Sequence, residues 1–134
     1  MLLVLSLIAI AAASTLKVPG GTLDLPPGCA SPGVETGPDS SLGFIECGVG
    51  KAKIGFVSLA KAPAPCDSSE LVQLQAQSGH PLIMCFRKVG RGQNPPETMF
   101  VDLGVGVLLL EVKSSKDILL LLRVAASFRA DSKQ

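Results

Sequence analysis

The sequence predicts an α+β domain in which an antiparallel sheet of about six strands packs against a C-terminal helix. A second short helix is an open alternative. The 14 glycines and 10 prolines are spread along the chain, which is typical of short strands joined by turns. The last apolar segment instead repeats at helical spacing. At 134 residues and 47% apolar composition, the chain is long enough for one domain and too hydrophobic to be disordered.

Short apolar or alternating segments mark the expected strands. They are residues 22–25, 42–47, 52–59, 82–89, 98–103 and 105–112. The first ends at Pro26, because proline cannot donate to a strand ladder. The second and third are close in sequence, which predicts a hairpin. Residues 107–110 are apolar on both faces, which indicates a central strand that is covered on both sides.

Three segments rich in proline, glycine or polar residues are expected to be loops. They are residues 31–39, 61–65 and 90–96. Residues 70–77 fit either a strand or a short helix that buries Leu71 and Leu74, and the pattern leaves both readings open.

The clearest helix lies near the C-terminus. Ser114 can cap it, and Asp117 lies close to the positive end of the helix dipole. The apolar residues at helical spacing are Ile118, Leu121, Leu122, Ala125 and Phe128. The polar tail from Ala130 is expected to be loose.

The N-terminal residues 1–13 carry no charge and are almost wholly apolar. The run is about 12 residues long, against the roughly 20 that a membrane-spanning helix needs, and it fits the apolar core of a signal peptide. Signal peptides usually begin with Lys or Arg, whereas the first charge here is Lys17. The alternative is a buried first strand or helix of a cytosolic domain.

Small residues allow signal-peptide cleavage before Ser14 or before Thr15. The recognition positions would be Ala11 and Ala13, or Ala12 and Ser14. The expected organisation is a signal peptide over residues 1–14 and a single domain over residues 15–134. The apolar runs at 105–112 and 118–124 are each too short to cross a membrane, so no span is expected after signal removal.

Four cysteines occur in the chain, at Cys29, Cys47, Cys66 and Cys85. An even count in a small exported chain predicts two disulfides. Three pairings are possible, and the sequence does not choose between them, although neighbouring segments favour Cys29–Cys47 with Cys66–Cys85. The alternative is four reduced thiols buried in a cytosolic core.

The same cysteines do not have the spacing of a metal site or a redox motif. Successive cysteines are 18, 19 and 19 residues apart, and His80 is the one histidine. We therefore expect no metal. Cys66 precedes Asp67-Ser68-Ser69-Glu70, which is typical of a helix start and would favour a thiolate, but Asp67 and Glu70 oppose one.

The sequence contains no catalytic set. His80 lies in a predicted turn, Ser78-Gly79-His80-Pro81, and is interpreted as an exposed turn residue rather than a general base. The Gly48-Val49-Gly50-Lys51 segment lacks the remaining spacing of a phosphate-binding loop. No spacing brings two carboxylates together. The expectation is no catalytic residue and no cofactor.

A net charge of +1 gives no electrostatic case for a nucleic-acid partner. The small basic group at Arg87, Lys88 and Arg91 fits an exposed hairpin. The candidate partner-binding residues lie in two polar loops. They are Glu35, Asp39, Ser40 and Ser41 in the first loop, and Arg91, Gln93 and Asn94 in the second.

The order of several motifs resembles the small exported bacterial proteins of the PsbP-like and DcrB-like type. The resemblance runs from about residue 22 to residue 129 and rests on motif order. The motifs are Leu23-Asp24-Leu25-Pro26-Pro27-Gly28, Asp39-Ser40-Ser41-Leu42-Gly43, Lys53-Ile54-Gly55-Phe56 and Ala125-Ala126-Ser127-Phe128-Arg129. The chain is shorter than the better-known members, and its four cysteines and Pro63-Ala64-Pro65 loop are not part of the shared pattern.

This resemblance implies an antiparallel sheet covered by helices on one or both faces. It also implies a binding or assembly protein of the cell envelope rather than an enzyme. Some proteins of this shape are similar in role to immunity proteins that neutralise a secreted toxin. No binding residue is carried over from the resemblance.

Taken together, the residues predict an exported, non-catalytic protein that binds a protein partner in the periplasm or outside the cell. Two alternatives stay open. One is a small enzyme that depends on a thiol, through Cys66, or on carboxylates. The other is a structural component of the envelope.

Overall fold

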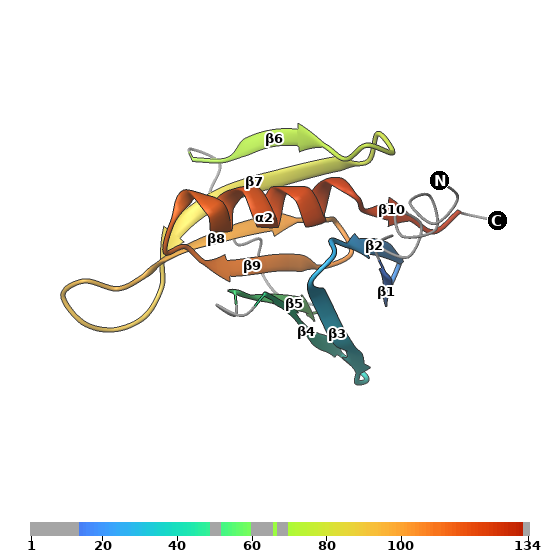
Figure 1. Cartoon of the computed structure of the whole chain (residues 1–134), viewed down its shortest axis with the longest axis horizontal. Helices are drawn as coiled ribbons and strands as arrows, with labels where there is room; N and C mark the ends of the chain where they lie inside the picture. Colours follow the sequence, from blue (N-terminus) through green and yellow to red (C-terminus); the bar gives the residue numbers. More distant parts are fainter. Residues whose placement is uncertain (1–13, 49–51, 60–65, 67–69, 133–134) are drawn as a thin grey trace, which may run out of the picture.

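The computed structural model describes residues 14–48, 52–59, 66 and 70–132. This part of the chain forms ten strands and one helix (Figure 1). The elements are β1 (Ser14–Val18), β2 (Gly21–Leu25), β3 (Cys29–Thr36), β4 (Ser40–Cys47), β5 (Ala52–Leu59), β6 (Val72–Gln75), β7 (Pro81–Lys88), β8 (Glu97–Asp102), β9 (Val107–Glu111), α2 (Ser115–Ala126) and β10 (Arg129–Ala130).

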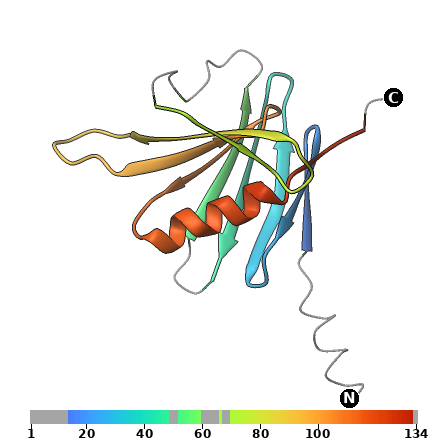
Figure 2. The ribbon, with the colours of Figure 1, turned by 90° about the horizontal axis from the view of Figure 1, so that it is seen from above.

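The strands form two antiparallel sheets. The larger has seven strands in the order β3-β4-β5-β9-β8-β7-β6, and the smaller has three in the order β1-β2-β10. Seen from above, α2 lies against one face of the large sheet (Figure 2). The helix contacts β8 and β9 of the large sheet and β2 of the small one, so it joins the two sheets.

The hydrophobic core lies between α2 and the sheets. Side chains of a strand alternate between the two faces of its sheet, so every second residue of the central strands points to the helix. The fully buried members include Leu23, Ile45, Ile54, Phe56, Met99, Val101, Leu108, Leu121, Val124 and Phe128. The helix covers this face of the sheet.

The α+β class predicted from the sequence is confirmed, with an antiparallel sheet and a C-terminal helix. The number of strands differs from the prediction. The sequence predicted one sheet of about six strands, whereas the described residues form one sheet of seven strands and one of three. Three strands escaped the prediction, namely β1, β3 and β10.

Strand β3 lies where residues 31–39 were expected to form a loop. Pro32 and Gly33 disfavour a regular strand, but β3 is an edge strand with a bulge between Ala30 and Gly33. Edges and bulges are the places where a sheet tolerates proline. The loop prediction was therefore wrong for residues 31–36, and the turn into β4 begins only after Thr36.

Residues 72–75 form strand β6 rather than a helix, paired with β7. This excludes the short helix over the described part of segment 70–77. The helix predicted from Ser114 is confirmed as α2, although Phe128 lies just beyond its end and is still fully buried. Residues 1–13 and 61–65, where the signal peptide and one loop were predicted, lie outside the described residues.

Polar contacts tie the small sheet to the end of the helix. Arg129 on β10 makes two hydrogen bonds, of 2.9 and 3.0 Å, to the Asp24 carboxylate on β2. Hydrogen bonding to Asp24, and then its negative charge, raise the pKa of the Arg129 guanidinium. The Ser127 hydroxyl also accepts a hydrogen bond from the Asp24 amide at 2.9 Å.

Candidate functional site

The most distinctive surface is the face of the large sheet that points away from α2, which we call the open face. The strand register places Phe44, Gly55, Leu109, Phe100 and Cys85 in one row across five strands of this face. A neighbouring row begins with Leu42, Val57 and Val107. The open face is therefore apolar over much of its width.

This apolar surface is most exposed at β4. Leu42 is 51% exposed and Phe44 is 49% exposed, while Val57 and Leu109 beside them are partly buried. An antiparallel sheet with one face on the core normally presents polar residues on the other. Exposed apolar residues that gather on one face, rather than scatter singly, are typical of an interaction surface.

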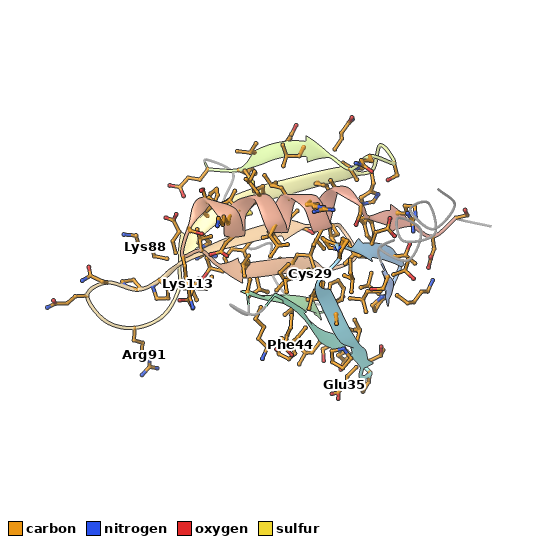
Figure 3. All side chains as sticks on the ribbon, viewed as in Figure 1. Cys29, Glu35, Phe44, Lys88, Arg91 and Lys113 are labelled. Atoms are coloured by element: carbon orange, nitrogen blue, oxygen red, sulfur yellow. A yellow bond between two sulfur atoms is a disulfide. The ribbon has the colours of Figure 1, made fainter. Side chains whose placement is uncertain are left out.

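Charged side chains surround the exposed pair. Glu35 on β3 is directly opposite Leu42, and Glu46 follows Phe44 on the same face of β4. The Lys53 ammonium lies 4.4 Å from the centre of the Phe44 ring, where it makes a cation–π contact. Figure 3 shows Phe44 and Glu35 on the β3–β4 strands at the bottom of the view, away from the β7–β8 loop at the left.

The two disulfides involve residues at different positions in this sheet. Cys29 and Cys47 are opposite each other on β3 and β4, and their bond joins the edge strand to its neighbour. The second bond joins Cys66 to Cys85 on β7, whose side chain belongs to the open face and is only 2% exposed. The pairing favoured by the sequence is confirmed, and the alternative of four reduced thiols is not what the structure contains.

The predicted partner-binding residues do not come together in one site. Glu35 and Asp39 are exposed at the β3–β4 hairpin, and Ser40 is partly buried. Ser41, also predicted as a contact residue, is only 6% exposed. It alternates with Leu42 on β4 and therefore points toward the core.

The second predicted group lies in the loop between β7 and β8. Arg91, Gln93 and Asn94 are all exposed there. Strands β5 and β9 separate the β3–β4 hairpin from the β7–β8 pair in the sheet, and Figure 3 shows Glu35 and Arg91 at different ends of the molecule. The two loops are thus separate surfaces.

The side chains considered for catalysis have structural contacts. His80 is partly buried rather than exposed: its Nε2 lies 2.6 Å from the Leu103 carbonyl, and its ring meets Phe128 edge-on at 4.9 Å. Cys66 is held in a disulfide. Among the described residues, no group of three His, Cys, Asp or Glu side chains is placed to bind a metal ion.

Two open grooves lie on the described part of the molecule. One, of about 590 Å³, lies between β1 and β3 and is lined mainly by apolar atoms of residues such as Leu16, Val18 and Val34. The other, of about 560 Å³, lies over the β6–β7 hairpin next to Gln73 and Ile83. Neither groove gathers a convergent set of charged or nucleophilic side chains.

Comparison with known protein families, curated proteins and solved structures finds no match for this chain. The resemblance to the PsbP-like and DcrB-like proteins therefore stays a prediction. In the described part of the chain, no helix combines the length and apolar character required to cross a bilayer.

Sequence reasoning missed Leu42 and Phe44 as site residues, although it placed both on a strand. The sequence of β4 could have indicated this surface, because the strand has apolar side chains on both faces. Ile45 points to the core, while Leu42 and Phe44 point away from it. For an edge-proximal strand, that double-sided pattern indicates either a second covering layer or a contact surface.

Proposed function

We propose that this chain is an exported, non-catalytic binding protein that acts by protein–protein contact in the periplasm or outside the cell. The observation that carries the proposal is the exposed pair Leu42 and Phe44 on the open face. Fully burying a leucine or phenylalanine side chain contributes about 1.5–3 kcal/mol. A partner that covers this pair would therefore gain appreciable binding energy.

Export is supported by the two disulfides, because such bonds persist in oxidising compartments. The proposed cleavage sites also agree with the fold. Cleavage before Ser14 leaves β1 whole, and cleavage before Thr15 removes only its first residue, which pairs with Leu25. Either product keeps Leu16 and Val18, the two residues by which β1 enters the core.

Export is tested by the intact mass of the protein recovered from its host, with thiol alkylation before and after reduction. We expect a chain that begins at Ser14 or Thr15 and four cysteines that react only after reduction. A chain that retains residues 1–13, with thiols that react at once, would contradict export.

Binding is tested by a pull-down from envelope extract with the Leu42→Ser/Phe44→Ser double variant. We expect wild-type protein to retain a specific partner and the variant to lose it, since the variant removes the apolar contact. Leu119→Ser is the matched control, because Leu119 is the most exposed large apolar side chain of α2, at 66%. Equal recovery by the wild type and the double variant, or no specific partner at all, would count against the proposal.

A further inference from the structure

We infer that the open face binds a second copy of this chain, through the loop between β7 and β8. This inference rests on the proposed function and names the partner for the same surface. Two surfaces of one molecule would meet in this contact. The first is the β4 patch, consisting of Glu35, Leu42, Phe44 and Glu46, and the second is the β7–β8 tip, consisting of Lys88, Val89 and Arg91.

Lys88 and Val89 of the β7–β8 tip lie where the connection between the two strands leaves the sheet. The connection between the two strands projects well beyond the sheet (Figure 1). Its base is closed by a hydrogen bond of 3.1 Å from the Val89 amide to the Pro96 carbonyl. Val89 is 46% exposed, which makes it one of the few large apolar side chains at the surface of the described residues.

Each of the two surfaces combines exposed apolar side chains with charges, and the charges are of opposite sign. In the tip, the exposed Val89 directly follows Lys88 in the chain and precedes Arg91 by two residues. In the β4 patch, the exposed Leu42 and Phe44 lie between the anions Glu35 and Glu46. An apolar centre with complementary charges at its rim is the arrangement that fixes the register of a protein contact.

Neighbouring side chains of the opposite charge reduce the net charge of each surface, but the patch stays negative and the tip stays positive. Lys53 lies over Phe44 within the patch, and Glu97 is opposite Lys88 at the base of the tip. Lys113 follows β9 at the same end of the sheet as Glu97, since the Val112 amide donates to the Glu97 carbonyl at 2.8 Å. Figure 3 shows Lys88, Arg91 and Lys113 together at one end, away from Glu35.

Patch and tip lie on separate parts of the molecule, so the tip of one copy meets the patch of another. The test is light scattering on oxidised protein recovered from its host, over a range of concentration and salt. We expect a mass above that of one chain that decreases as salt is added, because the contact includes exposed charges.

Two charge-reversal variants then address each side of the contact. Glu35→Lys/Glu46→Lys alters the patch, and Lys88→Glu/Arg91→Glu alters the tip. Each should weaken self-association by about tenfold or more, because like charges then meet. All four positions are exposed, and circular dichroism verifies that each variant folds. The charge-preserving Lys88→Arg/Arg91→Lys is the matched control and should associate as the wild type does.

Mixing the two charge-reversal variants gives the decisive result. The patch variant is positive at both surfaces and the tip variant is negative at both, so every contact between the two variants joins opposite charges. An equimolar mixture should therefore associate into a dimer or a larger species that neither variant forms alone. A wild-type protein that stays a single chain at its highest soluble concentration would overturn the inference. So would self-association that neither variant weakens, or a mixture in which the two variants do not associate. The pull-down with Leu42→Ser/Phe44→Ser tests the proposed function separately.

Discussion

At the scale of single residues, Gly21 determines how closely the small sheet approaches the end of the helix. A Cβ atom at Gly21 would lie 2.6 Å from Cε1 of the Phe128 ring and would also meet the Arg129 carbonyl. The absence of a side chain lets the fully buried Phe128 pack beneath β2. That close approach brings Arg129 within reach of Asp24.

Gly21→Ala should therefore lower the free energy of unfolding by about 1–3 kcal/mol, the usual cost of overfilling a packed site. Urea unfolding measures the change. Gly37→Ala is the control, because its added Cβ would come no nearer than 3.5 Å to Ser40. Equal stabilities of the two variants would show that Phe128 moves aside without cost.

At the scale of elements, the sequence predicted what is determined locally. Strands β4, β5 and β9 have strong apolar patterns, and α2 has a capping serine. Neighbouring residues were therefore enough to predict these elements. The edge strands β1, β3 and β10 lack such a pattern. β10 pairs with the sequence-distant β2, whereas β1 and β3 form hairpins with the strands that follow them. β3, for example, contains Pro32 and Gly33 and is held by its pairing with β4 and by the Cys29–Cys47 bond. The candidate surface was missed for a related reason, since the side of β4 that the helix covers depends on the whole sheet.

The Cys29–Cys47 bond should account for much of the stability of the β3 edge. Replacing both residues with alanine should lower the free energy of unfolding by about 3 kcal/mol, because the bond closes a loop and restricts the unfolded chain. Chemical unfolding of the oxidised proteins measures the loss. An unchanged midpoint would mean that strand pairing alone holds the edge.

Asp117 determines where α2 begins. Its Oδ2 atom accepts hydrogen bonds from the amides of Lys113, at 2.7 Å, and Ser114, at 3.2 Å. Asp117→Ala should lower the free energy of unfolding by about 1 kcal/mol, the typical value for a lost cap. Asp117→Asn keeps an acceptor oxygen and should lose less, as thermal unfolding of the two variants would show. An alanine variant as stable as the asparagine variant would rule out this role.

At the scale of the whole molecule, the two faces of the large sheet are unequal. The helix covers one face, and the other remains apolar and partly exposed, most of all at Leu42 and Phe44. The proposed function assigns this exposed apolar surface to contact with another protein. The central claim is that this face is covered in the cell.

Site-specific photo-crosslinking in the host tests that claim most directly. A photoreactive phenylalanine analogue replaces Phe44 in one strain and Leu119 in a control strain. The account predicts a covalent adduct from position 44 and none from position 119. An adduct with the mass of two copies supports the self-contact, whereas an adduct with a different protein supports the binding function and overturns the self-contact. No adduct from position 44, or equal adducts from both positions, would contradict the account.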